Sequence, residues 1–427
     1  MDIVKQLVES RPDFFANRIA DLDEAIRIND FIYMSIGLSN AYMVLAGKDR
    51  IIINTGMGFE ALTHKKVFDA IRPGPTPFII LTQGHVDHVG GVSLFRESGT
   101  HTPTKVIAQS NLAACQRDDK RIKTVRESQA YIWFQSVFDK VAADRSTPRP
   151  AFVQDTPTAD ISFDDRYAFE HGGLQFEIYA TPGGETIDSS VVWLPQHKIL
   201  FCGNVFGPLF PHFPNFNTIR GDRYRQFEPY LDSLRRIRAL DPELLITGHF
   251  EPIAGSALIR ACLDRLEAAV DFVHTETLKG MNGGKDIWTL MREVQLPAEL
   301  YVGQGYGKVS WGVRTVWETY MGWFKAQATS ELYPTQPREL YGELVALAGV
   351  GPTVARGRKK LQANDPEAAQ LLAEAALAHD GTSRDALQLS LDAHKALLAR
   401  SGGTNFWETG WLKTHIGKLE RTLAAAK

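Results

Sequence analysis

The sequence predicts an α/β fold in about its first two thirds, followed by an all-helical last third. Short apolar runs bounded by Gly and Asn recur from residue 31 to 110 and again from 175 to 250, which is typical of strands. Segments with apolar residues every three or four positions lie between these runs, as expected of amphipathic helices. This alternation indicates sheets that are covered by helices.

The strands and helices of the α/β part can be placed in order. Five strands are predicted in the first group, at FIYMSI, AYMVLAG, RIIINTG, FIILT and KVIAQS. Four more are predicted in the second group, at QFEIYATPGG, SSVVWLP, KILFCG and ELLITGH. Helices are predicted at roughly 111 to 145, at RYRQFEPYLDSLRRIRAL and at SALIRACLDRLEAAVDFVHTETL.

Helical patterns take over after about residue 280, so the predicted domains are residues 1–280 and 281–427. One helix is expected to begin at DPEAAQ, with Asp365 as its N-cap, and to end before Gly381. Another is expected over about Ser383 to Arg400. These segments show no strict period, so they favour helical hairpins over a repeat solenoid.

Composition limits the class of function. With 427 residues, 44% hydrophobic and 23% charged, the chain is typical of a globular protein with a large core. The formal net charge of -3 gives no reason to expect a nucleic-acid or anionic-membrane partner, so a small-molecule ligand is favoured. No apolar run approaches the roughly 20 residues that span a bilayer, and the N-terminus lacks a secretory pattern. With three scattered cysteines, a cytoplasmic protein is expected.

A cluster of potential metal ligands follows the predicted strand FIILT. The stretch LTQGHVDHVGG places Gln83, His85, Asp87 and His88 within six positions, and Gly84 lets the chain turn where the strand ends. Loop residues just beyond a buried strand are held by the scaffold yet open to solvent, where catalytic ligands tend to lie. Two imidazoles and a carboxylate suit a borderline-soft divalent metal, whereas the carboxamide of Gln83 is a weak ligand.

Two later strand ends carry residues of the same chemistry. Glu185 follows Pro-Gly-Gly in ATPGGETIDSS, and His249 follows a glycine in ITGHFEP. A single histidine is more often a surface or satisfied core residue than a ligand. Three strand ends together supply five candidates, so a metal site is the favoured interpretation; they are His85, Asp87, His88, Glu185 and His249.

These motifs resemble those of a known family. The string HxDH followed by GG, then TPGxE and then GH, resembles the metallo-β-lactamase superfamily, and most of all its alkylsulfatase branch. The resemblance implies an αββα sandwich followed by an all-helical domain. It also implies that NFNTIRG supplies sulfate-binding residues, which here are Asn215, Thr218 and Arg220. A planar, doubly donating guanidinium is well suited to two oxyanion oxygens.

The resemblance extends into the last third of the chain. GQGYGKVSWGVRTVWETYMGWF, residues 303–324, looks like the opening of the family's helical dimerisation domain, and NFWETG near residue 405 looks like its end. The resemblance therefore implies a homodimer that forms through the C-terminal helical domain. A plain core role remains the default for any single aromatic residue of this block.

Three positions depart from the family pattern, and each carries a neutral amide. Gln83 stands where the family has His, Asn204 where it has a carboxylate beside the metals, and Asn54 where it has Asp. Removing anionic and imidazole donors weakens a metal site, because a divalent ion gains most from charged or strongly basic ligands.

The departures affect the two implied metal sites unequally. The resemblance assigns one metal to the position of Gln83 with His85 and Glu185, and the other to Asp87, His88 and His249. The second set is complete, whereas the first keeps two strong ligands. We therefore expect unequal occupancy, with one or two zinc ions per chain.

The expected function is metal-dependent hydrolysis of an anionic, sulfate-ester-like small molecule with an apolar part. The resemblance implies catalytic roles for Asp87, Glu185 and Arg220, with metal-bound hydroxide as the nucleophile. The alternative is a family member with an altered metal site. Histidine and carboxylate sets also suit non-haem iron, so an oxygenase stays open, as does a binding protein without catalysis.

Overall fold

The computed structural model describes residues 2–96, 103–143, 154–216, 219–223 and 225–425. Contacts divide the chain into two compact units, here called the sandwich unit and the helical unit. The sandwich unit comprises Met1–Gln129 and Phe134–Thr319, and the helical unit comprises Ala130–Trp133 and Tyr320–Lys427. The domain limits expected from the sequence, at 280 and 281, stay a prediction.

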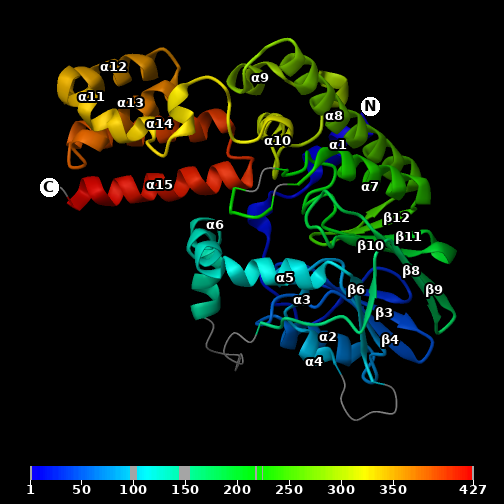
Figure 1. Ribbon diagram of the computed structural model, residues 1–427. Helices are drawn as coiled ribbons and strands as arrows, with labels where there is room; N and C mark the ends of the chain where they lie inside the picture. The colour runs from blue at the N-terminus through cyan, green and yellow to red at the C-terminus, as the bar shows by residue number, and fades with distance from the viewer. Residues whose placement is uncertain (1, 97–102, 144–153, 217–218, 224, 426–427) are drawn as a thin grey trace. The chain divides into compact units, whose positions relative to one another are not determined.

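Two β-sheets form the centre of the sandwich unit (Figure 1). The first sheet has seven strands in sequence order, β1 (Ile26–Arg27), β2 (Ile32–Ser35), β3 (Ala41–Ala46), β4 (Asp49–Ile53), β5 (Phe78–Ile80), β6 (Lys105–Gln109) and β7 (Ile161–Phe163). The second has six, in the spatial order β13 (Ile253–Ala254), β12 (Leu244–Thr247), β11 (Ile199–Gly203), β10 (Ser190–Leu194), β9 (Leu174–Ala180) and β8 (Arg166–His171). The nine strands predicted from apolar runs are confirmed.

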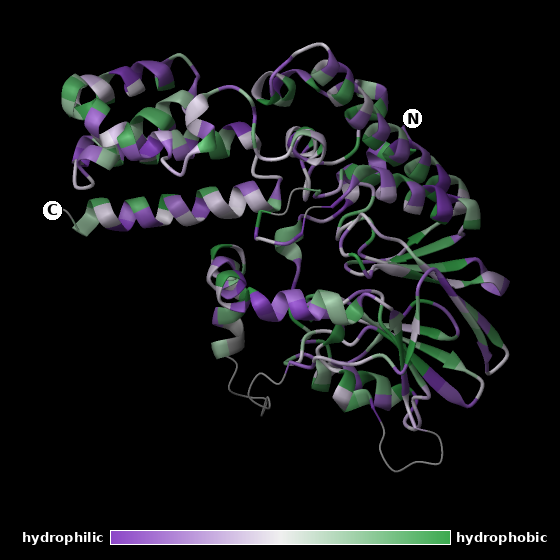
Figure 2. Ribbon diagram, in the orientation of Figure 1, coloured by the Kyte–Doolittle hydropathy of each residue, from purple (hydrophilic) through white to green (hydrophobic). Residues whose placement is uncertain are grey.

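Alternation along the strands explains how both faces of each sheet are covered. In β3, Tyr42 and Val44 belong to the core between the two sheets, whereas Met43 belongs to the core on the outer face of the first sheet. The central strands therefore read as nearly continuous apolar runs, which Figure 2 shows as green arrows.

Helices cover the outer face of each sheet. Against the first sheet lie α2 (Ala61–Ile71), α3 (Val86–Val89) and α4 (Val92–Phe95), and against the second lie α1 (Ile3–Ser10), α7 (Phe227–Leu240) and α8 (Ser256–Asn282). The other helices that begin in this unit are α5 (Leu112–Arg121), α6 (Lys123–Ala143), α9 (Ile287–Glu293) and α10 (Val309–Met321). The four layers, helix, sheet, sheet and helix, confirm the expected αββα sandwich.

Four strands, β1, β7, β8 and β13, have no counterpart in the prediction. Along β8 the side chains alternate between exposed and half-buried, and none is fully buried. This strand is the edge of the second sheet, so it lacks the apolar run by which a buried strand is recognised.

The helical unit contains five consecutive helices, α11 (Tyr341–Ala348), α12 (Val350–Gln362), α13 (Pro366–His379), α14 (Arg384–Ser401) and α15 (Phe406–Ala425). Asp365 caps α13, its carboxylate accepting a hydrogen bond from the backbone N–H of Ala368 at 3.2 Å. Ser383 caps α14 in the same way through Ala386. The predicted helices over 365–381 and 383–400 are thus confirmed.

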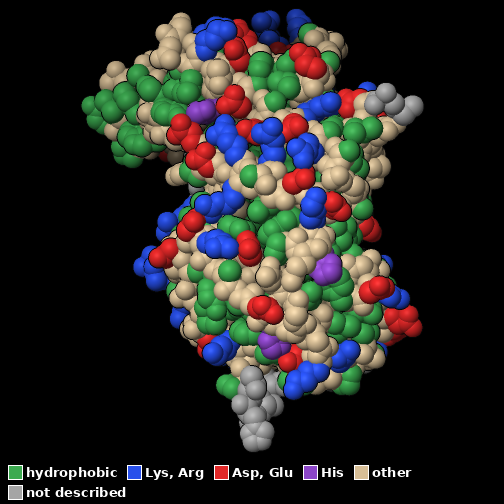
Figure 3. Space-filling model, turned by 90° about the vertical axis from the view of Figure 1, so that its right-hand side faces the viewer, with side chains coloured by type: hydrophobic (Ala, Val, Ile, Leu, Met, Phe, Trp, Pro, Cys, Tyr) green, Lys and Arg blue, Asp and Glu red, His purple; other side chains and the backbone are tan. Residues whose placement is uncertain are grey.

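Charged side chains of both signs are interspersed on the face drawn in Figure 3. Ion pairs also join α7 and α8, for example Arg235 with Glu267 at 2.8 Å. Within the described residues, no helix is both long and apolar enough to cross a membrane.

Candidate metal and substrate site

Three loops carry the predicted ligands; one follows β5 of the first sheet, and the other two follow β9 and β12 of the second sheet. His85 lies after β5 at the N-cap of the short helix α3, and Asp87 and His88 lie within this helix. Glu185 follows β9, and His249 follows β12. Gly184 permits the turn before Glu185, since a Cβ there would come within 2.2 Å of the Val205 carbonyl oxygen.

Asp87, His88 and His249 form a compact group. The carboxylate Oδ2 of Asp87 lies 3.7 Å from His88 Nε2 and 3.9 Å from His249 Nε2. In the described part of the chain, no other three His, Cys, Asp or Glu side chains bring their ligand atoms within 4.8 Å of one another. Two imidazoles and one carboxylate are a donor set that fits a single divalent ion.

The electrostatics of this group favour the ligand forms of all three residues. Burial opposes ionisation of Asp87, but the positive potential of His88 and His249 lowers its pKa to about 2. Burial also lowers the pKa of His88, and it lowers that of His249 to about 4. At neutral pH the carboxylate is therefore ionised and both imidazoles are neutral, which is the state that binds metals.

Asn204, at the end of β11, touches both imidazoles of this group. Its Nδ2 lies 3.0 Å from His88 Nε2 and 3.1 Å from His249 Nε2, while its buried Oδ1 has no hydrogen-bond partner. If the Asn204 amide is turned by about 180°, Oδ1 instead of Nδ2 faces the two imidazoles and can accept hydrogen bonds from them. An oxygen at this position would also suit a bound cation. A Cβ at Gly248 would come within 2.1 Å of Oδ1, so only glycine leaves room for this side chain.

Asn54, directly after β4, contacts the other side of His88. Its backbone adopts φ of 57°. Its Oδ1 accepts a hydrogen bond from the Thr82 backbone N–H at 3.0 Å, which fixes the amide so that Nδ2 faces His88 Nδ1 at 3.0 Å. An amide N–H donated to Nδ1 leaves the proton of a neutral imidazole on Nε2. Asn54 thus favours the tautomer whose Nε2 is not free to bind a metal.

The remaining predicted ligands form a second group, in which each side chain has a protein partner. Gln83 Nε2 lies 3.0 Å from His85 Nδ1, and the buried Gln83 Oε1 has no hydrogen-bond partner. Both carboxylate oxygens of Glu185 accept hydrogen bonds from Arg225, at 3.0 and 2.8 Å. His85 Nε2 lies 3.1 Å from the carboxylate of Asp222.

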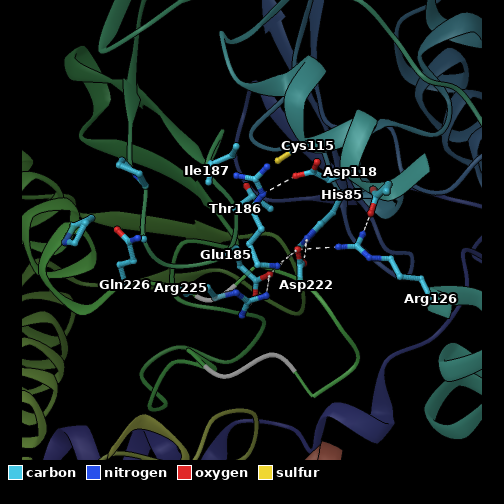
Figure 4. A pocket seen from close by; sticks show the side chains of 15 residues that line it. His85, Cys115, Asp118, Arg126, Glu185, Thr186, Ile187, Asp222, Arg225 and Gln226 are labelled. Atoms are coloured by element: carbon cyan, nitrogen blue, oxygen red, sulfur yellow. Dashed lines mark hydrogen bonds and ion pairs between the residues drawn. The ribbon is translucent and has the colours of Figure 1, made fainter. Parts of the chain in front are cut away.

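Sequence reasoning missed three charged residues of this second group. Asp222 and Arg225 flank the motif NFNTIRG, so charged residues next to a recognised motif were the available signal. Arg126 lies in α6, far away in sequence, and pairs with Asp222 at 2.8 Å. Figure 4 shows Arg225 directed at Glu185, and Asp222 between His85 and Arg126, beside one cavity.

The predicted sulfate-binding residues are only partly described. Asn215 is buried, and its carbonyl oxygen accepts a hydrogen bond from Arg225 at 2.7 Å. Arg220 is half-buried. Burial lowers the pKa of Arg220, but neighbouring acidic groups, including Asp222, Glu185 and Asp87, raise it overall. The positive charge of Arg220 is therefore close to both groups of predicted ligands. Thr218 lies outside the described residues.

One aromatic residue, Phe14, packs against His249 and connects it to a second, Tyr306. Phe14, in the 3-10 helix η1 (Phe14–Ala16), packs edge-on against the His249 ring at 5.6 Å and against the Tyr306 ring at 5.2 Å. Phe14 was not predicted as a site residue, because a lone aromatic near the N-terminus carries no signal of its own.

Comparison with known protein families finds two matching regions. The profile of the metallo-beta-lactamase superfamily matches residues 35–249, and a profile described as alkyl sulfatase dimerisation matches residues 289–409.

Curated relatives also match over much of the chain. A linear primary-alkylsulfatase of a Pseudomonas strain is 28% identical over 72% of this chain and 60% of its own length. The alkyl/aryl-sulfatase BDS1 of Saccharomyces cerevisiae is 23% identical over 92% of this chain and 63% of its own length. The chain thus spans about three fifths of the length of these relatives.

Solved structures show the same fold. A double mutant of the sec-alkyl sulfatase PisA1 superposes with a TM-score of 0.80 at 20% identity, covering 99% of this chain and 70% of that protein. The stereoselective inverting sec-alkylsulfatase Pisa1 from Pseudomonas sp. superposes with a TM-score of 0.78 at 20% identity, covering 94% of this chain and 66% of that protein.

Proposed function

The chain belongs to the metallo-beta-lactamase superfamily, and on this premise we propose that it is a metal-dependent hydrolase of a sulfate ester with an apolar part. The observation that carries the proposal is the group of half-buried Asp87 with buried His88 and His249, whose ligand atoms lie within 4.8 Å of one another. Relatives named as primary, secondary and alkyl/aryl-sulfatases support the class of substrate.

Asp87, His88 and His249 would hold the metal in this proposal. Two imidazoles and a carboxylate, with one position left open, are the donor set of catalytic zinc, and they also suit non-haem iron. A divalent metal bound there lowers the pKa of a coordinated water toward about 7, which makes hydroxide available at neutral pH.

Arg220 would bind the sulfate group of the substrate. Its positive charge lies near both groups of predicted ligands, and a guanidinium can donate two parallel hydrogen bonds to a tetrahedral oxyanion. Asn215, which is buried beside Arg225, and Thr218 are proposed to complete this oxyanion site.

The apolar part of the substrate would lie against aromatic side chains. Phe14 packs against His249 and against Tyr306, so apolar side chains adjoin one of the proposed metal ligands. Tyr306 belongs to residues 303–324, the block that resembles the opening of the family's helical dimerisation domain.

A homodimer is proposed through the helical unit, because the matching family profile is described as a dimerisation region. Large apolar side chains exposed in this unit support the proposal, among them Leu347 at 88%, Trp323 at 68% and Tyr333 at 63% exposure. We further propose that the substrate is an anionic small molecule and that the protein is cytoplasmic. Neither nucleic acid nor a membrane is proposed as a partner.

A second candidate is a protein that binds a ligand without hydrolysing it. The observation in its favour is the amide of Asn204, which lies within 3.1 Å of both imidazoles of the metal group. An iron-dependent oxygenase is a further alternative, since the same three ligands suit iron.

Metal analysis combined with one variant tests the proposal. Protein purified without added metal should contain about one zinc per chain and release inorganic sulfate from alkyl sulfates of different chain lengths. His249→Ala should lose both the metal and the sulfate release while keeping the wild-type circular dichroism spectrum. Iron in place of zinc would favour the oxygenase, and a metal-free protein that still binds alkyl sulfates would favour the binding protein. A His249→Ala variant with full metal content would refute the ligand assignment.

A further inference from the structure

The second group of predicted ligands is held by protein charges. Glu185 is almost fully buried, and its two oxygens are bonded to the two terminal nitrogens of Arg225, which is buried as well. A bidentate carboxylate–guanidinium pair of this kind uses the lone pairs that a metal ion would need. Glu185 therefore already has its counter-charge.

His85, the other strong donor of this group, is engaged at both ring nitrogens. Nδ1 faces the amide of Gln83 at 3.0 Å, and Nε2 faces Asp222 at 3.1 Å. Asp222 is in turn paired with Arg126 at 2.8 Å. His85 Nδ1 also lies 3.5 Å from Glu185 Oε2, so these two atoms alone could approach one ion.

The balance of charge argues against that ion. Three guanidinium groups, Arg225, Arg126 and Arg220, already act on three carboxylates, Glu185, Asp222 and Asp119. A divalent cation bound to Glu185 would lie beside the guanidinium of Arg225, and like charges repel strongly in a buried, poorly screened site. The residues of the second group therefore do not fit a metal.

We infer that this protein holds one metal ion, at Asp87, His88 and His249, and that the Arg225 guanidinium takes the electrostatic place of a second ion at Glu185. The inference rests on the proposed function, because it concerns the same site. It differs from the expectation drawn from Gln83, since Arg225 would keep the second site closed even if a histidine stood at position 83.

Titration of the metal-free wild-type protein with Zn²⁺, followed by calorimetry, is the first test. We expect one tight ion per chain and a second that binds at least a hundredfold more weakly. Two equally tight ions would overturn the inference and leave the hydrolase intact. A chain that binds no zinc would overturn the metal-dependent function itself, and the inference with it.

Two paired variants then isolate Arg225. Gln83→His alone should gain no second tight site. Gln83→His combined with Arg225→Gln should bind the second Zn²⁺ at least tenfold more tightly than Gln83→His. The matched control combines Gln83→His with Arg223→Gln. Arg223 lines the same cavity, but its side chain is exposed and pairs with Asp118 at 2.6 Å. A gain in the control equal to that in the Arg225 variant would overturn the inference.

Loss of Arg225 leaves Glu185 buried without a counter-charge, so the fold of that variant is checked by circular dichroism and thermal unfolding. Arg225→Lys, which keeps the charge, should leave the second site closed when combined with Gln83→His. If the Arg225→Gln variant does not fold, the single Gln83→His variant still decides, because a second tight zinc in it contradicts the inference.

Discussion

At the scale of single residues, the site is governed by amides placed beside imidazoles. Asn54, Gln83 and Asn204 each place a side-chain nitrogen about 3 Å from a ring nitrogen of His85, His88 or His249. Because a neutral imidazole has one donor and one acceptor, His88 can accept a hydrogen bond from only one of the two amides that face it, Asn54 and Asn204. The imidazole ligand atoms are therefore contacted by residues outside the proposed metal group of Asp87, His88 and His249.

The first prediction concerns Asn54, whose amide favours the tautomer of His88 with its proton on Nε2. In Asn54→Asp the carboxylate would accept a hydrogen bond from His88 Nδ1–H and release Nε2 for the metal. We expect zinc affinity to rise by about tenfold or more, as is common for carboxylates behind metal-binding histidines. Calorimetry measures the change, and Asn29→Asp, outside the site, is the control for added charge. Unchanged affinity would show that Asn54 does not set the tautomer.

The second prediction concerns Arg220 as the sulfate-binding residue. Arg220→Lys keeps the positive charge but loses the planar pair of donors, so KM for an alkyl sulfate should rise by about tenfold. Metal content should stay at the wild-type value. Arg223→Lys, a neighbouring exposed arginine, should leave KM unchanged. If Arg220→Lys has wild-type kinetics with every anionic substrate tested, the sulfate site lies elsewhere.

The third prediction uses His64, a buried histidine that lies outside the predicted ligand set. Burial lowers the pKa of His64 to about 3, while its Nδ1 lies 2.7 Å from the Ser35 hydroxyl. The folded-state pKa is below the unfolded value of about 6.5, so protonation favours unfolding. Its stabilising effect is complete above pH about 6.5 and is lost progressively as the pH falls toward about 3.

Chemical denaturation at neutral pH and at pH about 5 measures this effect. Between these values the wild type should lose about 2 kcal/mol more of its free energy of unfolding than His64→Gln, which cannot be protonated. His197→Gln, at an exposed position, should behave like the wild type. Equal losses in the wild type and His64→Gln would show that His64 titrates normally in the folded protein.

At the scale of elements, short loops after strands bring the site together, and caps define the helices. The ligand loops follow β5, β9, β11 and β12, which pack in the middle of the two sheets and so hold the loop bases in place. In the helical unit, the start of α13 depends on Asp365, which accepts from the Ala368 N–H and pairs with Lys360 at 3.1 Å.

The fourth prediction tests this cap. Asp365→Ala removes the acceptor from the first turn of α13 and should destabilise the helical unit by about 1 kcal/mol. Asp365→Asn keeps an acceptor oxygen and should lower the free energy of unfolding by only about a few tenths of a kcal/mol. Thermal unfolding compares the two variants. If both variants lower the Tm equally, the charge pair with Lys360 matters more than the cap.

At the scale of the whole molecule, apolar surface in the helical unit points to self-association. Leu347 and Trp323 are exposed to a degree that is unusual for large apolar side chains in a monomer. The fifth prediction is that the wild type sediments as a dimer, with twice the 47.6 kDa of one chain. Leu347→Asp together with Trp323→Asp should shift it toward the monomer. Arg356→Asp, which introduces the same acidic side chain at an exposed polar position, should not. A monomeric wild type at micromolar concentration would contradict the proposed dimer.

The sequence by itself determined the fold class, nine of the strands and the helical segments that contain α5 to α8, α13 and α14. Buried strands and amphipathic helices carry their periodicity in consecutive residues, so local pattern is enough to recognise them. The edge strand β8 was not predicted, because its side chains alternate between exposed and half-buried and form no apolar run. Ligands that follow strand ends were also recognisable, since His85, Asp87 and His88 lie within one short motif.

Only the tertiary structure decided which of these side chains are available to a metal. Arg225 reaches Glu185 across 40 residues, and Asp222 reaches His85 across 137 residues. Such pairings depend on which loops the two sheets bring together. A local sequence pattern does not encode contacts between residues so far apart in the chain. The same holds for the amides of Asn54 and Asn204, whose effect on His88 arises from opposite sides of one ring. The residue types indicate a metal centre, but the partners of each charge decide how many ions it can hold, because a buried carboxylate that is already neutralised has little affinity left for a second cation.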